Sequence, residues 1–166
     1  MKEKDKKLTI SKIKEGTVID HISSGKALLV LKILGIGSKT KETVSMAMNV
    51  PSKKMGRKDI VKVEGKFINK EELNRIALIA PKATINLIRD YRVDKKFKVH
   101  LPRIVEGILK CPNKSCISNC SKEPVISRFY VNLHENKVIA KCYYCSKKIT
   151  EIDKYLIGRS FLSDIL

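Results

Sequence analysis

The stretch ILKCPNKSCISNC, residues 108–120, holds three of the five cysteines of this 166-residue chain. The other two stand in KCYYC, residues 141–145. Cys142 and Cys145 have the spacing of a metal-binding knuckle, in which one tight turn presents two thiolates to a single ion. The first stretch has to supply the second pair, and it offers Cys111, Cys116 and Cys120.

Spacing alone allows two choices for that second pair. Cys111 and Cys116 are separated by four residues, and Pro112 directly after the first cysteine favours a turn. Cys116 and Cys120 are separated by three residues, which is also typical of zinc modules. The spacing therefore leaves one cysteine over without saying which one.

The residues between the two cysteine groups predict a small β domain. EPVISRFYVNLHENKVIAKC, residues 123–142, has the pattern of a hairpin that turns at Glu135 and Asn136. A β module closed by two knuckles is typical of a zinc ribbon or a rubredoxin-like domain. Zn²⁺ suits four thiolates because it is tetrahedral and redox-inert, although iron also binds such a site.

The expected role of the metal is structural, because four protein ligands leave no open coordination position for water or substrate. A module of this size with few aromatic residues has a weak core, so the metal should contribute much of its folding free energy. Removing the metal is expected to unfold residues 103–155 and to leave residues 8–95 folded.

The formal net charge of +18 favours anionic partners, such as nucleic acid, phosphorylated small molecules or an acidic protein. Aromatic residues make up only 5% and tryptophan is absent, which argues against a stacking surface for nucleic acid. The N-terminal residues lack the apolar region of a signal peptide, and the longest apolar run, residues 27–31, is too short to span a membrane. We therefore expect a cytoplasmic protein without a membrane partner, in which clustered cysteines hold metal rather than form disulfides.

Residues 8–95 have the element order of a ferredoxin-like βαββαβ unit, after a charged tail at residues 1–7. The hydrophobic periodicity predicts a helix after Ser24, over residues 25–34, that ends near Gly35 and Gly37. Asn69 and Glu72 resemble a capping box that starts a second helix, and Pro81 ends it. The expected strands cover residues 17–22, 43–50 up to Pro51, 59–68 with a hairpin turn at Gly65, and 83–93.

The remaining segments carry weaker patterns. Residues 52–58 are typical of a basic, turn-like loop, and residues 94–103 of a linker or a short crossing between the two domains. In the tail, residues 151–166, apolar residues recur near helical spacing.

A second candidate site follows from the predicted topology. In a βαββαβ sheet the first and third strands are central neighbours, and the last strand is an edge strand beside the first. Lysines suit a triphosphate, a carboxylate suits ribose hydroxyls, and amide or hydroxyl groups can read a base. All three kinds of group occur near these strands, at Asp20, His21, Lys58, Lys62, Asn86, Tyr91, Lys95 and Lys96.

Five motifs in this order resemble the regulatory chains of aspartate carbamoyltransferase, over roughly residues 8–150. They are GTVIDHI, NVPSKKMGRKDIVKVEG, APKATINLIRDY, CPNKSCIS and KCYYC. The resemblance implies a non-catalytic subunit that controls pyrimidine biosynthesis. It also implies a nucleotide-binding, dimer-forming allosteric domain at residues 1–100 and a zinc domain at residues 101–166 that docks on the catalytic chain.

The resemblance also implies ligands and site residues. The effectors would be CTP, often with UTP, and ATP, and the partners a second regulatory chain and the catalytic chain. One structural Zn²⁺ would be held by Cys111, Cys116, Cys142 and Cys145, which leaves Cys120 as the spare thiol. The nucleotide would contact Lys12, Ile13, Val18, Asp20, His21, Lys58, Lys62, Asn86, Ile88, Tyr91, Val93 and Lys96.

Two rival functions are weighed against this one. A basic zinc-ribbon protein that binds nucleic acid is favoured by the charge and disfavoured by the scarcity of aromatic residues. An enzyme is disfavoured because the sequence offers no catalytic pair, no open metal site and no nucleophile beside a base. At residue 12 the chain has Lys where the resemblance leads us to expect a small residue.

Overall fold

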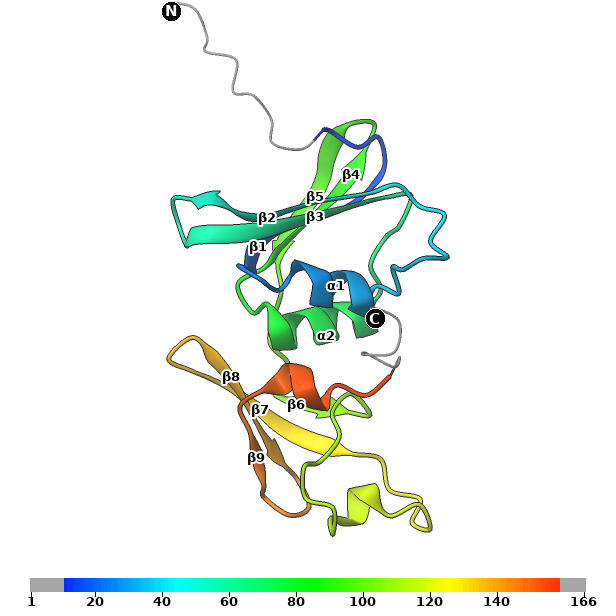
Figure 1. Ribbon diagram of the computed structural model, residues 1–166, viewed down its shortest axis with the longest axis vertical. Helices are drawn as coiled ribbons and strands as arrows, with labels where there is room; N and C mark the ends of the chain where they lie inside the picture. Colours follow the sequence, from blue (N-terminus) through cyan, green and yellow to red (C-terminus); the bar gives the residue numbers. More distant parts are fainter. Residues whose placement is uncertain (1–10, 159–166) are drawn as a thin grey trace, which may run out of the picture. The chain divides into compact units, whose positions relative to one another are not determined.

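The computed structural model describes residues 11–158, which form two compact units. Of the described residues, the first unit holds 11–68 together with 82–98, and the second holds 69–81 together with 99–158. Each unit contains one antiparallel sheet (Figure 1). In the described part of the chain, no helix is both long and apolar enough to cross a membrane. The tail predicted at residues 1–7 lies outside the described residues.

The first unit is a five-stranded sheet with the strand order β2-β3-β1-β4-β5. All neighbouring strands are antiparallel, and β1 and β3 lie side by side near the centre. The predicted ferredoxin-like order is therefore confirmed for the first four strands, and a fifth is added to it. The strands are β1 (Gly16–Ser23), β2 (Val44–Ser52), β3 (Gly56–Glu64), β4 (Thr84–Arg89) and β5 (Arg92–Lys98).

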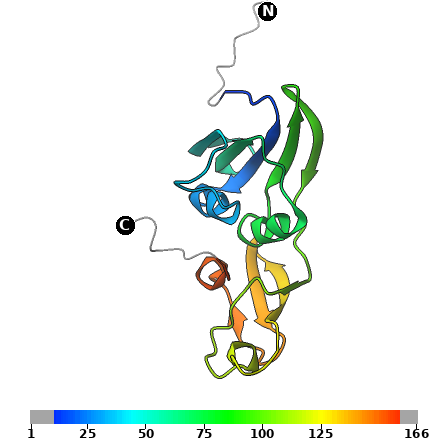
Figure 2. The ribbon, with the colours of Figure 1, turned by 90° about the vertical axis from the view of Figure 1, so that its right-hand side faces the viewer.

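Helix α1 (Ala27–Ile33) lies along one face of this sheet (Figures 1 and 2). On β3, Asp59, Val61 and Val63 are buried, whereas the alternate residues between them are only half-buried. Asp59 accepts a hydrogen bond from the N–H of Ala27, so the buried residues of β3 face α1. The fully buried apolar core of this unit includes Ile19, Ile22, Ala27, Val30, Val61 and Ile85.

The start of α1 differs from the prediction. Ser24 does not cap the helix; its hydroxyl donates to Oδ1 of Asn49. The N-cap residue is Lys26, which has no side-chain capping bond. The carboxylate of Asp59 instead accepts from the N–H groups of Gly25 and Ala27, at 2.8 and 3.0 Å between nitrogen and oxygen. A distant strand thus supplies the acceptor that a local serine usually provides.

The strand predicted over residues 83–93 is confirmed only as β4, Thr84–Arg89, because the chain reverses at Asp90 and Tyr91. Both residues have positive φ, 48° and 62°, as the central positions of a type I′ turn require. The following residues form β5, so the predicted linker at 94–103 begins as an edge strand. All seven residues of β5 are exposed, which explains why its sequence lacks the apolar alternation of a core strand.

Two predicted turns are also misplaced. Strand β2 continues through Pro51 to Ser52, which is tolerated because β2 is an edge strand and one side of it needs no hydrogen bonds. The hairpin between β2 and β3 turns at residues 53–55, inside the predicted basic loop. Gly65 is therefore not a hairpin turn: β3 ends at Glu64, and the chain then leads to the second helix.

The second unit contains helix α2 and a four-stranded sheet with the order β6-β7-β8-β9. The predicted capping box at the start of α2 is confirmed, as is the hairpin turn at Glu135 and Asn136, which have φ of 47° and 64°. Instead of the predicted helical tail, residues 152–155 form one 3₁₀ turn, and residues 159–166 are outside the described part. The elements are α2 (Lys70–Ile79), β6 (Ile104–Glu106), η1 (Ile117–Asn119), β7 (Arg128–His134), β8 (Lys137–Cys142), β9 (Lys148–Ile149) and η2 (Ile152–Tyr155).

Candidate functional site

Four cysteine sulfurs converge in the second unit. Those of Cys111, Cys116, Cys142 and Cys145 all lie within 4.8 Å of one another. The sulfur of Cys111 is 3.5 Å from that of Cys145, and the sulfur of Cys116 is 3.7 Å from that of Cys142. Cys120 is exposed and is not part of this group. Of the two pairings that spacing left open, the structure brings together Cys111 and Cys116.

The group fits a tetrahedral metal ion. With zinc–sulfur bonds of 2.3 Å, the sulfurs of an ideal tetrahedron are about 3.8 Å apart, close to the distances between these thiols. Burial raises the pKa of Cys111 and that of Cys142, whereas the N–H of Lys147 lowers the pKa of Cys145 to about 6. A bound cation would hold all four sulfurs as thiolates and satisfy the buried charge.

The two knuckles are closed in different ways. In the second knuckle the backbone closes itself, because the N–H of Ser146 donates to the carbonyl of Cys142. In the longer first knuckle the N–H of Cys116 donates to the carbonyl of Asn113, and a side chain adds two further bonds: Nδ2 of Asn119 donates to the carbonyls of Cys111 and Asn113, at 2.9 and 2.7 Å. Asn119 therefore fixes the loop that carries two of the four sulfurs. Its only signal in the sequence is its position in the turn after Cys116.

We expect Asn119→Ala to release the metal about 10-fold to 100-fold faster, the usual effect of losing a group that orients metal ligands. The measurement is the half-time of metal transfer from the full chain to a chromophoric chelator. Asn132→Ala is the matched control, because Asn132 is an exposed asparagine on β7 of the same unit. Equal rates for the two variants would show that Asn119 does not hold the knuckle.

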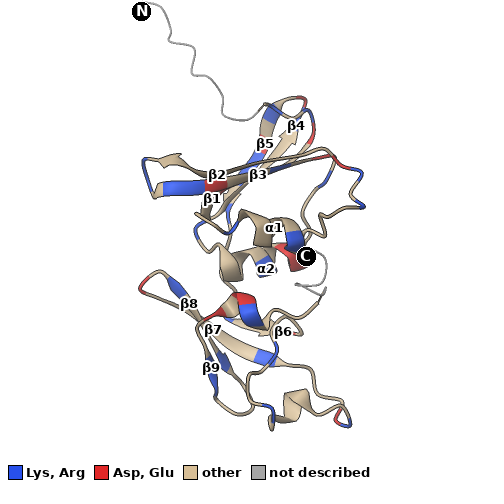
Figure 3. Cartoon of the chain, in the orientation of Figure 1, with Lys and Arg blue, Asp and Glu red and all other residues tan. Residues whose placement is uncertain are grey.

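Several of the predicted nucleotide residues lie on the face of the first sheet that points away from α1. Val18 on β1 pairs with Lys62 on β3 and with Asn86 on β4, and Asn86 pairs with Lys96 on β5. These four residues form one row across four strands, with a lysine at each end. Figure 3 shows the basic residues on β3 and β5 that flank the row. We call this surface the open face.

A bulge places Asp20 and His21 next to this row. The register of β1 against β3 shifts between Ile19 and Ile22, and His21 has a positive φ of 57°. Bulges of this kind often redirect side chains beside functional sites. Oδ1 of Asp20 accepts from the backbone N–H of His21 at 2.6 Å and pairs with Nζ of Lys58 at 2.7 Å.

The charges around Asp20 and His21 are mostly positive. Burial lowers the pKa of His21, Asp20 opposes that shift, and the charges of Lys58, Lys54 and Lys96 lower it further. Nδ1 of His21 is buried and has no hydrogen-bond partner among the described residues. Burial also lowers the pKa of Lys62. An anion bound here would offset these repulsions. Lys54 is a further nearby cation, which is not among the residues predicted for this site.

The other predicted residues surround the same face. Nζ of Lys62 donates to the carbonyl of Ser11, and the N–H of Tyr91 donates to the carbonyl of Lys14. The segment that contains Lys12 and Ile13 therefore runs from β3 to the β4–β5 turn, with Ile13 buried and Lys12 exposed. Ile88 pairs with Val93 one row away from Asn86 and Lys96. Tyr91 lies in the turn rather than on a strand.

Comparison with known proteins also divides the chain into two parts, although it places residues 69–81 with the first part rather than with the second unit. The family model for the allosteric domain of aspartate carbamoyltransferase regulatory chains matches residues 8–100, and the model for their metal-binding domain matches residues 103–154. The regulatory chain of Archaeoglobus fulgidus is 64% identical over 151 residues, which are 91% of this chain and 99% of that protein. The regulatory chain of Pyrococcus horikoshii is 55% identical over 145 residues, 87% of this chain and 93% of that protein.

Proposed function

The chain belongs to the family of aspartate carbamoyltransferase regulatory chains, and we propose that it binds nucleoside triphosphates on the open face of its first sheet. Its relatives are named as regulatory chains, so it is a regulatory subunit and not the catalytic one. The observation that carries the proposal is the row of Lys62, Val18, Asn86 and Lys96 across four strands.

The chemistry of the row suits such a ligand. Lys62 and Lys96 would attract phosphate groups, with Lys58 and His21 close by at the bulge. Asp20 would accept from ribose hydroxyls after exchanging its bond to Lys58. Val18 offers apolar contact for a base, and the side-chain amide of Asn86 can donate to or accept from a base edge. CTP, UTP and ATP share the triphosphate and the sugar, so the base contacts must distinguish them.

In Lys62→Ala, affinity for CTP, UTP or ATP is expected to fall about 10-fold to 100-fold, because a hydrogen bond to a charged group contributes about 1.5–3 kcal/mol. Calorimetric titration of the regulatory chain in complex with the catalytic chain measures this. Lys148→Ala is the matched control, since Lys148 lies on β9 of the other sheet. The proposal would be refuted if none of the three nucleotides bound the unaltered complex, or if both variants bound them equally well.

We further propose that the metal is a single structural Zn²⁺. Four thiolates at near-tetrahedral distances support zinc over harder metals, and metal analysis of the purified chain can distinguish it from iron.

The assembly is also a proposal. The catalytic chain is the partner of a regulatory chain, and we propose that the second unit docks on it and that two copies of this chain pair through the first. The edge strand β2, which exposes Met46 and Met48, supports a contact between copies. We place the complex in the cytoplasm, where unpaired cysteines persist as metal ligands.

A further inference from the structure

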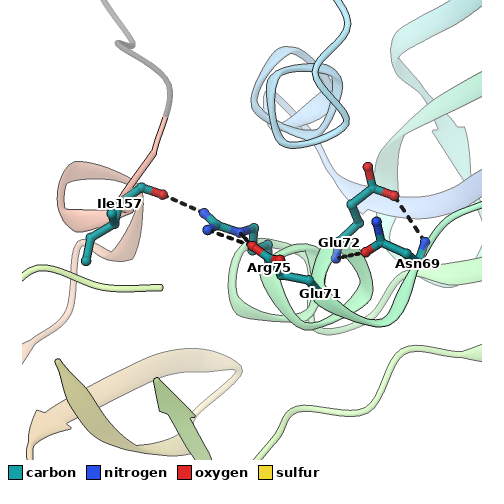
Figure 4. Close-up of polar contacts among 5 residues, drawn as sticks. All are labelled: Asn69, Glu71, Glu72, Arg75 and Ile157. Carbon is teal, nitrogen blue, oxygen red and sulfur yellow. Dashed lines mark hydrogen bonds and ion pairs between the residues drawn. The ribbon is translucent and has the colours of Figure 1, made fainter. Parts of the chain in front are cut away.

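Helix α2 has an unusual place in the chain. It is connected at one end to β3, which carries Lys58 and Lys62, and at the other to β4, which carries Asn86. By its packing, however, α2 belongs to the unit that holds the four cysteines. Its first turn is fixed by the capping box between Asn69 and Glu72, with hydrogen bonds of 2.9 and 3.1 Å (Figure 4). A well-defined helix therefore links two nucleotide-site strands to the metal-binding unit.

Arg75 connects this helix to the C-terminal segment. Its Nη1 donates to the carbonyl oxygen of Ile157 at 2.6 Å, and its Nε and Nη2 both donate to Oε1 of Glu71, one turn earlier (Figure 4). The Arg75 side chain is only 17% exposed although Glu71 is 68% exposed. The guanidinium is thus held in place by its own helix and points its remaining nitrogen, Nη1, at the backbone of residue 157.

The C-terminal segment is in turn joined to the first metal knuckle. The N–H of Ile157 donates to the carbonyl of Ile108, and the N–H of Lys110 donates to the carbonyl of Tyr155, both at 2.7 Å. Leu109 and Leu156 form a β-bridge between these two bonds, and Leu109 is fully buried. Lys110 is the residue directly before Cys111, so this pairing fixes the point where the chain enters the metal site.

We propose that Arg75 is a coupling residue, which transmits nucleotide binding to the unit that docks on the catalytic chain. The chain itself connects β3 and β4 to α2, and within the second unit hydrogen bonds run from Arg75 to Ile157 and from residues 155–157 to residues 108–110, next to Cys111. An effector acts at a distance only through an element that both sites influence, and α2 with its C-terminal partner is such an element. This inference rests on the proposed nucleotide site and adds the route of regulation.

The test uses the full complex with the catalytic chain and measures two quantities separately. The first is the affinity for CTP and for ATP, and the second is the change in carbamoyl-transfer activity at saturating nucleotide. In Arg75→Gln, affinity is expected to stay within about 2-fold, whereas the nucleotide-induced change in activity should fall about 3-fold to 10-fold, a range typical of coupling mutations. Arg75→Lys keeps one charged donor, so it should restore part of the response.

Lys70→Gln is the matched control, because Lys70 is an exposed basic residue on the same helix. It should leave both affinity and response unchanged. If Arg75→Gln binds nucleotide normally and the nucleotide still changes its activity as much as in the unaltered complex, Arg75 is not a coupling residue, and the proposed function is unaffected. If the unaltered complex bound no nucleotide, the proposed function would fail and the inference with it, so the two failures are distinguishable.

Discussion

Cys142→Ser is expected to unfold residues 103–155 at 25 °C while the first unit stays folded. The described core of the second unit is small, with Phe129 as its largest fully buried side chain. Structural zinc contributes about 10–16 kcal/mol to the folding of comparable zinc-finger peptides, more than the whole stability of most domains. Cys142 is buried and its sulfur lies 3.7 Å from that of Cys116, so a serine there removes one of the four ligands.

Hydrogen exchange followed by mass spectrometry measures the unfolding separately for each region of the chain. Peptides from β7 and β8 should lose their protection in Cys142→Ser or after chelation, whereas peptides from β1 and β3 should keep theirs. Cys120→Ser is a closely matched control, because Cys120 is exposed and lies outside the sulfur group. Unchanged protection of β7 and β8 after complete metal removal would contradict a structural role for the metal.

The features that the sequence predicts well are those with local signals. The capping box of α2 needs only Asn69 and Glu72, and the turn at Glu135 and Asn136 is signalled locally by a polar pair between two apolar runs, in which Asn136 tolerates positive φ. The Cys142–Cys145 knuckle is equally local. For the other pair, spacing was ambiguous, and the resemblance to a family selected Cys111 and Cys116.

The features that were missed have no recognisable signal in the local sequence pattern. The turn at Asp90 and Tyr91 has no glycine, so the run over residues 83–93 resembled one strand. The bulge at His21 is visible only when β1 is paired with β3. Asn119 closes the first knuckle by binding two carbonyls, which no spacing rule describes. The residues of the proposed nucleotide site were named individually, but the alignment of Lys62, Val18, Asn86 and Lys96 in one row is a property of strand register.

Asp59 is the clearest example of such a long-range feature, and replacing it should have the largest effect in the first unit. It is fully buried on β3. Oδ2 accepts from the N–H groups of Gly25 and Ala27, and Oδ1 accepts from the N–H of Asn49 at 2.8 Å. One carboxylate thus secures the start of α1 and the bulge of β2, where Asn49 has a φ of 56°.

Asp59→Ala is therefore expected to destabilise the first unit by about 3–5 kcal/mol, because three backbone N–H groups lose an ionised acceptor at once. Asp59→Asn keeps an acceptor oxygen without the charge and should cost less. Asp94→Ala is the matched control: Asp94 is 44% exposed and pairs with Arg89 at 3.5 Å, a surface pair worth about 0–1 kcal/mol. The free energies come from hydrogen exchange of peptides in β1 and β3, since a single unfolding midpoint is not defined for two separate units. A loss below about 1 kcal/mol in Asp59→Ala would mean that water or another side chain replaces the carboxylate, and that the fold does not depend on it.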